Sequence, residues 1–124
     1  MDRSISVMVV DDFATMRRIV SGTLKKLGYE NIVEADNGLA ALEMLRANKV
    51  DLVLSDCNMP EMSGMELLQA VRADDNLKDV VFILMTGEDQ GETIIEMVKA
   101  GVNDYIVKPF TPQALDAKLV RALG

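Results

Sequence analysis

Five short runs of branched apolar residues recur along the chain, and a segment with helical periodicity follows each of them. Runs that are rich in Val, Ile and Leu, with little polar alternation, are typical of strands covered on both faces of a parallel sheet. The predicted strands are 5–10, 32–35, 51–55, 80–85 and 105–107. Five strand–helix units need right-handed crossovers, so the pattern predicts an α/β fold with an open, doubly wound parallel sheet. The periodicity does not define the strand order.

The segments between these runs carry recognisable helix ends. Apolar residues recur at helical spacing over 16–27, and Gly28 follows them where a left-handed C-terminal cap is expected. The helical period of 38–47 depends mainly on three leucines, and the polar segment 72–78 predicts a loop. Further end signals are a capping box of Ser63 and Glu66, a terminal glycine at Gly101, and an N-cap with a first-turn proline at Thr111 and Pro112.

Length and composition exclude several classes of protein. The 124 residues support one compact domain over 1–124, which should bury about two-thirds of its unfolded surface. The 20 acidic residues outnumber the 13 basic ones, giving a net charge of −7, so binding to nucleic acid or to anionic membrane is not expected. One cysteine and no histidine exclude an internal disulfide and a zinc site. The apolar runs are too short to span a bilayer and no signal peptide is evident, so we expect a cytoplasmic protein.

Reactive side chains follow four of the five predicted strands. Asp11 and Asp12 follow the first, Asp56 the third, Thr86 the fourth and Lys108 the fifth. Ligands of open parallel sheets bind outside the carboxyl ends of the strands, so these groups are expected at one edge. The second strand is followed only by a turn over 35–38.

Taken singly, most of these residues have a structural explanation. Asp12 would serve as a helix N-cap or as an acid that stabilises the helix dipole, Thr86 as a helix cap or a turn residue, and Lys108 as a solvated surface cation. Asp56 is harder to explain in this way, because it ends a run that should be buried on both faces, where an unpaired carboxylate is costly.

Taken together, the same residues predict a metal-assisted phosphoryl site. Clustered carboxylates resist ionisation unless a cation lies among them, and a ligand set of oxygens alone favours Mg²⁺. Phosphoryl chemistry needs a nucleophile, a metal, a cation and a hydroxyl donor. The chain supplies an aspartate, a Mg²⁺ site, Lys108 and Thr86 for these roles.

Dense motifs at these strand ends resemble the receiver domain of two-component response regulators over essentially the whole chain. The motifs are VVDD at 9–12, SD-x-NMP-x-M-x-G at 55–64, MT at 85–86 and VKPF at 107–110. The segment 12–20 and Tyr105 resemble the single-domain regulators of chemotaxis most closely. The resemblance implies a flavodoxin-like (βα)5 fold with strand order 2-1-3-4-5.

The resemblance also implies a role for each acidic residue. Asp56 would accept a phosphoryl group from a histidine kinase. Asp12 and Asp56 would bind Mg²⁺ through their carboxylates, with the backbone carbonyl of Asn58 as a further ligand and Asp11 acting largely through water. Asn58, together with Glu88, would tune the hydrolysis of the phosphorylated form.

The same resemblance implies a phosphoryl-binding pair and a switch. Thr86 and Lys108 would contact phosphoryl oxygens, and a cis peptide bond between Lys108 and Pro109 would direct the lysine to the site. On phosphorylation Thr86 would move and Tyr105 would fill the space, which would reshape the face formed by the fourth helix, the fifth strand and the fifth helix.

The output partner implied by the resemblance is the flagellar motor switch, but some residues depart from the chemotaxis pattern. Cys57 stands where those regulators carry tryptophan, and its expected role is packing. The acidic segment 87–92 and Asp104 add negative charge near the output face, which weakens the case for an acidic partner, whereas Phe110 and Lys118 match the pattern. A receiver that serves a different phosphorelay stays open as an alternative, and a monomer is expected.

Other function classes are less compatible with the sequence. A phosphatase of the haloacid-dehalogenase kind would need a second acid at Asn58 and a cap domain. A flavin-binding module would need a Ser/Thr/Gly-rich loop where Asp11 and Asp12 stand. A receiver that acts without phosphorylation would not need the acidic set. We therefore expect a signalling domain that catalyses only its own phosphorylation and dephosphorylation, not an enzyme.

Overall fold

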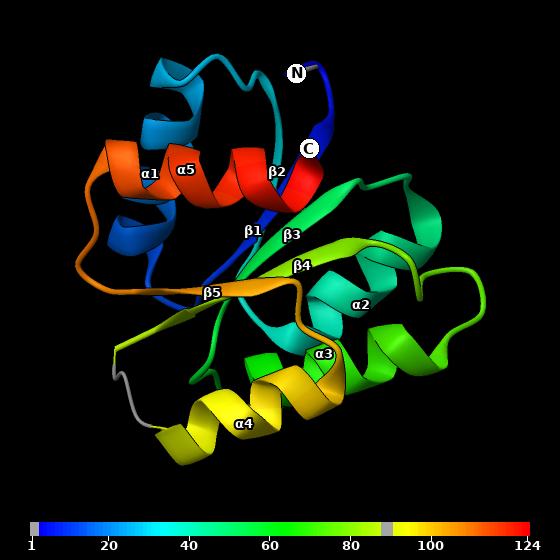
Figure 1. Ribbon diagram of the computed structural model, residues 1–124. Coiled ribbons are helices and arrows are strands. Elements are labelled where there is room, and N and C mark those ends of the chain that lie inside the picture. Colours follow the sequence, from blue (N-terminus) through cyan, green and yellow to red (C-terminus); the bar gives the residue numbers. More distant parts are fainter. Residues whose placement is uncertain (1–2, 88–90) are drawn as a thin grey trace.

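The structure is a computed structural model that describes residues 3–87 and 91–124, with five strands alternating with five helices along the described chain (Figure 1). The strands are β1 (Ser6–Val10), β2 (Asn31–Ala35), β3 (Leu52–Asp56), β4 (Val81–Thr86) and β5 (Asp104–Val107). The helices are α1 (Ala14–Lys26), α2 (Gly38–Ala47), α3 (Gly64–Ala73), α4 (Gly91–Ala100) and α5 (Pro112–Leu123). Within the described segments, no helix is both long and apolar enough to cross a membrane.

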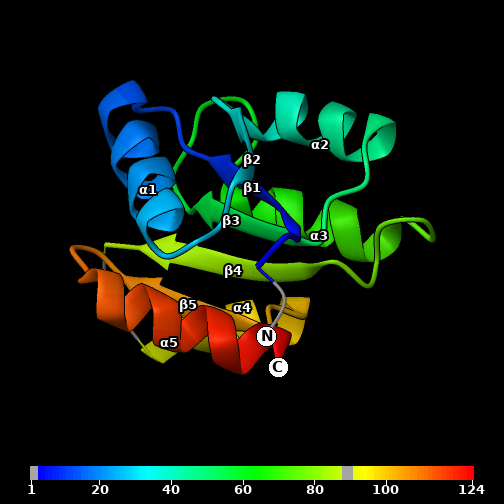
Figure 2. The same cartoon turned by 90° about the horizontal axis from the view of Figure 1, so that it is seen from above.

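The strands form one parallel sheet in the order β2-β1-β3-β4-β5, which confirms the implied flavodoxin-like topology. Helices α1 and α5 cover one face, and α2, α3 and α4 cover the other (Figures 1 and 2). The β1–β3 pairing brings together strand ends that lie more than 40 residues apart in the sequence. It aligns Val10 with Ser55, so that Asp11 and Asp56 extend from adjacent positions.

Two apolar clusters, one on each face of the sheet, form the core. Alternate residues of each strand enter opposite clusters: Val7 and Val9 pack with α1 and α5, whereas Met8 and Val10 pack with α2, α3 and α4. All four of these side chains are fully buried, which explains why the strand lacks polar alternation.

The predicted helix ends agree with the structure. Ser63 and Glu66 form a complete capping box, and the Thr111 side chain accepts a hydrogen bond from the backbone of Ala114. Gly28 and Gly101 both adopt positive φ, at 101° and 93°. The helix predicted over 38–47 has those bounds in the structure.

Each predicted strand differs from the observed one by one residue at one end or at both, and the end of α3 was also misplaced. Asp56 and Thr86 are the last residues of β3 and β4 and do not lie beyond them, because the backbone pairing with the neighbouring strands continues through both positions. The segment 72–78 is not all loop, since α3 continues to Ala73 and includes Arg72.

Arg72 joins two loops that lie at the end of the sheet where β4 begins. Its Nε donates a hydrogen bond to the Gly101 carbonyl at 2.9 Å, and its Nη1 donates to the carbonyls of Lys78 and Val80 at 2.8 and 2.7 Å. Its Nη2 donates to Asn103 Oδ1 at 2.8 Å. This single side chain therefore fixes the approach to β4 and the turn before β5.

Replacing Arg72 with methionine is expected to lower the free energy of unfolding by about 2 kcal/mol, because four hydrogen bonds from a charged donor are lost while the aliphatic stem is kept. Denaturant unfolding followed by circular dichroism measures this. Arg46→Met is the matched control, because Arg46 is more exposed and makes one ion pair, to Asp74 at 3.3 Å, so its loss should cost less than about 0.5 kcal/mol. Equal losses for the two variants would contradict the role assigned to Arg72.

Candidate functional site

Three carboxylates meet at the carboxyl end of the sheet. Asp11 and Asp12 follow β1 directly, and Asp56 ends the adjacent strand β3. One oxygen from each carboxylate lies within 4.8 Å of the others. Asp11 is fully buried and Asp56 is 7% exposed, whereas Asp12 faces solvent. The cluster thus opens to the surface on one side.

The buried carboxylate of Asp11 is only partly satisfied by the protein. Its Oδ1 accepts a hydrogen bond from the backbone N–H of Phe13 at 2.9 Å. Its Oδ2 is buried without a hydrogen-bond partner, and the nearest cation recorded for it is Lys108 Nζ at 3.9 Å. Burial raises the pKa of Asp11, and Asp56 raises it further, against the lowering effects of the Phe13 N–H and of Lys108. An added cation would relieve both the desolvation and the repulsion.

The residues of this cluster fit a magnesium ion. Three carboxylates provide hard oxygen donors, which Mg²⁺ prefers, and Asp11 Oδ2 is buried without a hydrogen-bond partner. Asp12 is free for this role, because the N-cap of α1 is Phe13 and the cap has no side-chain hydrogen bond. The alternative of Asp12 as an N-cap is therefore wrong.

Lys108 brings a positive charge to Asp56 from the end of β5. Its Nζ donates to Asp56 Oδ1 at 2.9 Å, and the backbone N–H of Cys57 donates to the same oxygen at 2.9 Å. The Lys108 backbone N–H donates to the Thr86 carbonyl at 2.7 Å, and the peptide bond to Pro109 is cis, as the resemblance implied. Two donors therefore orient the Asp56 carboxylate.

Thr86 ends the strand next to the one that carries Asp56. It is the last residue of β4 and only 5% exposed, and β4 pairs with β3 so that its neighbour Met85 aligns with Asp56. Thr86 is therefore one position beyond Asp56 along the paired strands, at the same edge of the sheet.

Asn58 and Tyr105, two further predicted site residues, are not among the three clustered carboxylates. Asn58 is an exposed residue of the β3–α3 loop, two positions beyond Asp56. Tyr105 is half-buried in β5 and packs against the core on the α2–α4 side of the sheet. Glu88 lies outside the described residues, as does part of the acidic segment 87–92.

Sequence reasoning missed two residues that support the cluster. The Nη1 of Arg17 donates to the Asp11 carbonyl at 2.8 Å, and its Nε donates to Glu34 at 3.1 Å, so it links α1 and β2 to the end of β1. Gly64 allows α3 to begin against the Asp56 backbone, because a Cβ at this position would collide with the Asp56 carbonyl oxygen. Gly64 is the last position of the 55–64 motif, which is the sequence signal that could have identified it. No such signal distinguishes Arg17 from its neighbours.

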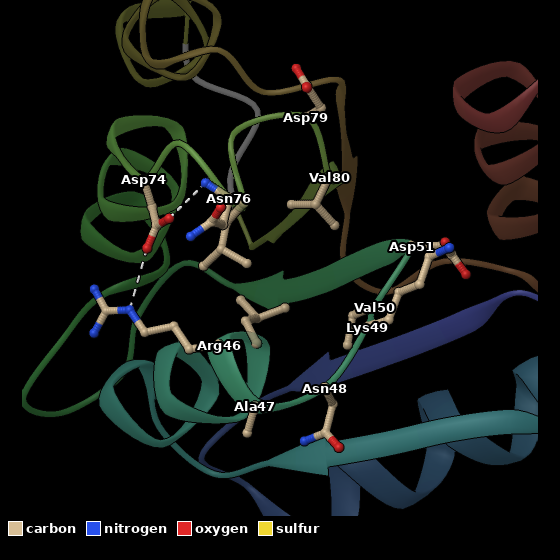
Figure 3. A pocket seen from close by; sticks show the side chains of 12 residues that line it. Arg46, Ala47, Asn48, Lys49, Val50, Asp51, Asp74, Asn76, Asp79 and Val80 are labelled. Carbon is tan, nitrogen blue, oxygen red and sulfur yellow. Dashed lines mark hydrogen bonds and ion pairs between the residues drawn. The ribbon is translucent and has the colours of Figure 1, made fainter.

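A hollow of about 780 Å³ lies at the opposite end of the sheet (Figure 3). Residues before β3 and β4 line it, including Asn48, Asp51 and Val80, and the Arg46–Asp74 ion pair crosses part of it. None of the clustered carboxylates contributes to it. The acidic site is therefore separate from this hollow.

The Cys57 thiol is expected to react slowly, which tests whether it acts as a redox sensor. Burial and the Asp56 charge raise its pKa to about 11, so little thiolate is present at pH 8. Because the pKa of the thiol rises from 9.0 to about 11, the thiolate fraction at pH 8 falls by about 100-fold. Alkylation by iodoacetamide at pH 8 in EDTA should therefore be about 100-fold slower in the folded protein than in urea. Mass spectrometry measures both rates, since Cys57 is the only cysteine. Comparable rates would make a reactive thiol the better interpretation.

Comparison with known proteins connects this geometry to one family. The profile of the response regulator receiver domain matches residues 7–120. The chemotaxis protein CheY-3 of Vibrio cholerae is 49% identical over 119 residues, which cover 96% of this chain and 92% of that protein.

Solved structures show the same similarity. CheY4 of Vibrio cholerae superposes with a TM-score of 0.89 at 36% identity, covering 95% of this chain and 98% of that one. The receiver domain of a sensor histidine kinase from Pseudomonas aeruginosa superposes with a TM-score of 0.88 at 26% identity, covering 98% of each chain. That structure has a magnesium ion coordinated in its active-site cleft.

Proposed function

Because this chain belongs to the response regulator receiver domain family, we propose that it is a phosphorylation-controlled signalling domain whose phosphoacceptor is Asp56. The observation that carries the proposal is the juxtaposition of three carboxylates within 4.8 Å with the Lys108 ammonium 2.9 Å from Asp56. A surface cluster of this kind suits a phosphoryl group that another protein delivers.

In the proposed step, a carboxylate oxygen of Asp56 attacks the phosphorus of a phosphohistidine on a kinase. The new O–P bond forms as the P–N bond breaks, and the electron pair of that bond returns to the imidazole nitrogen of the kinase. Bound Mg²⁺, held by Asp12, Asp56 and the backbone carbonyl of Asn58, would neutralise phosphoryl charge. Asp11 would act on it largely through water.

The protein's own groups have distinct parts in this chemistry. Lys108 offsets negative charge at Asp56, and the Cys57 N–H orients the carboxylate before attack. The hydroxyl of Thr86, which lies one position beyond Asp56 along the paired strands, would donate to a phosphoryl oxygen after transfer. The single substrate is the chain itself, so the proposed protein is not a turnover enzyme.

The proposed output is a change of the face formed by α4, β5 and α5. Movement of Thr86 toward the phosphoryl group would vacate space for Tyr105, which lies on β5 next to β4. The population of the new arrangement shifts only as far as the phosphoryl contacts favour it. Asn58 and Glu88 are proposed to leave water a path to the phosphorus, which predicts a phosphorylated lifetime of minutes and not many hours.

The proposed partners follow from the relatives. Proteins named for chemotaxis are 46–49% identical to this chain, so we propose a histidine kinase as donor and the flagellar motor switch as the output partner. The alternative of another phosphorelay is favoured by Asp104, because this acid pairs with the nearby Lys118 and so reduces the positive charge available to an acidic partner.

Acetyl phosphate tests the proposal without a kinase. Incubation with acetyl phosphate and Mg²⁺ should add one phosphoryl group, seen in the intact mass, and EDTA should suppress it by about 100-fold or more. Uptake that is unaffected by EDTA would contradict the metal assignment. Continuous hydrolysis of a phosphomonoester would instead support the phosphatase alternative.

A further inference from the structure

Asp104, Tyr105 and Lys118 form a cluster that the proposed chemistry does not use, here called the β5–α5 cluster. Lys118 Nζ lies 3.0 Å from Asp104 Oδ1 and 5.0 Å from the centroid of the Tyr105 ring. The ammonium is therefore shared between a carboxylate and an aromatic face, both of which attract a cation.

The cluster wraps around the edge of the sheet. β5 is the edge strand of the sheet next to β4, and α5 and α4 lie on its two sides (Figure 1). Ile106 packs with α5, whereas Tyr105 packs with the core on the α4 side. Lys118 of α5 thus contacts Asp104 and also the ring of Tyr105, whose side chain packs on the other face of the sheet.

Asp104 fixes this arrangement through one oxygen. Its Oδ1 accepts the Lys118 ammonium and also the backbone N–H of Tyr105, at 2.8 Å. The Asp104 side chain is 14% exposed and that of Lys118 is 29% exposed, so water screens the pair only in part. The carboxylate thus holds the ammonium beside the ring of its own neighbouring residue.

We propose that Asp104 is a positioning residue for Tyr105. By holding Lys118 against the ring, it favours the ring position seen in this structure and opposes the movement of the ring that the proposed switch requires. The link to switching rests on the proposed function, whereas the positioning of the ring does not. The competing explanation is that the ion pair only joins α5 to β5 and has no effect on the position of the Tyr105 ring.

The chain offers a direct measurement, because Tyr29 and Tyr105 are its only tyrosines and it has no tryptophan. The Tyr29 hydroxyl is buried without a hydrogen-bond partner, so Tyr29→Phe should preserve the fold and make Tyr105 the sole tyrosine emitter. Acrylamide quenching of its emission then reports the accessibility of the ring. The Tyr29→Phe protein is the parent for this experiment. Its quenching constant is measured without metal, and again with saturating Mg²⁺ and beryllofluoride as the phosphoryl mimic.

Asp104→Asn and Lys118→Gln, each in the Tyr29→Phe background, should shift the metal-free quenching constant toward the value of the beryllofluoride-loaded parent. Each should also lower the beryllofluoride concentration at half-saturation by about two- to fivefold. The double variant should match either single variant, because both remove one interaction. Lys118→Arg should keep the parent value, since it retains the ion pair and the ring contact.

Lys99→Gln is the matched charge control, because it removes an exposed lysine from α4 and should leave both readouts unchanged. The proposal is overturned if Asp104→Asn and Lys118→Gln leave the metal-free quenching constant at the parent value. It is also overturned if Lys99→Gln has the same effect as they do. A parent protein that does not respond to beryllofluoride and Mg²⁺ would contradict the proposed function, while an altered constant in Asp104→Asn would still support the positioning role.

Discussion

Asp56→Asn is expected to abolish phosphoryl uptake from acetyl phosphate, to below the detection limit of intact-mass analysis. The amide lacks the negative oxygen that attacks phosphorus, and neighbouring Asp11 and Asp12 are not held by Lys108 at hydrogen-bond distance. The variant should fold, because the amide oxygen can still accept the bonds from Cys57 and Lys108. Replacing one of three clustered acids also removes repulsion.

Asp75→Asn is the control for this experiment, since Asp75 is an exposed acid of the α3–β4 loop, away from the cluster. It should take up phosphoryl as the parent does. The assignment of Asp56 as phosphoacceptor would be contradicted if Asp56→Asn still took up phosphoryl groups and none of them were on Asp11 or Asp12. Thermal unfolding of both variants checks that lost uptake does not come from lost structure.

Gly64→Ala is expected to lower the free energy of unfolding by about 3 kcal/mol and to impair phosphoryl uptake. A Cβ on residue 64 would overlap the Asp56 carbonyl oxygen and approach Leu84 Cδ2 to 3.0 Å. Because the first of these is backbone, the start of α3 or the end of β3 must move, and overpacking of this kind costs up to a few kcal/mol. Displacing the end of β3 displaces the Asp56 carboxylate as well. Urea unfolding and acetyl phosphate uptake measure the two effects.

Gly22→Ala provides the opposite expectation. Apart from its chain neighbours and the backbone of its own helix, no described atom lies within 4 Å of a Cβ built on Gly22, which is in the interior of α1. Alanine should therefore stabilise the protein by about 0.5–1 kcal/mol through helix propensity. A Gly64→Ala protein with parental stability and uptake would show that the contact between α3 and β3 is adaptable.

Much of the fold was predictable because burial on both faces leaves an unbroken apolar run in the sequence. Val7 to Val10 and 52–54 are fully buried, and this is what the composition of the runs indicated. The predicted ends of β3 and β4 fall one residue short of the observed ends, because Asp56 and Thr86 are polar yet keep their backbone pairing. Periodicity reports side-chain environment, whereas strand ends depend on backbone hydrogen bonds. Strand order came only from the resemblance.

The acidic cluster was predictable for a related reason: parallel strands deliver the residues that follow them to one edge. Contacts that depend on side-chain reach were not predictable in this way. Arg72 and Arg17 read as ordinary surface cations, yet each binds carbonyl groups of distant segments. The pairing of Asp104 with Lys118 likewise depends on how α5 packs against β5, which no local pattern encodes.

The central place of β3 in the strand order has a thermodynamic consequence. The strand that carries Asp56 lies between β1, which leads into the remaining acids, and β4, which leads to Thr86 and the output face. If phosphorylation couples these two flanks, the coupling must act equally in both directions. If a bound cation tightens the docking of a protein on the α4–β5–α5 side, that docking must tighten cation binding at the three carboxylates by the same factor. Magnesium affinity measured with and without the docked protein would then give the strength of this coupling.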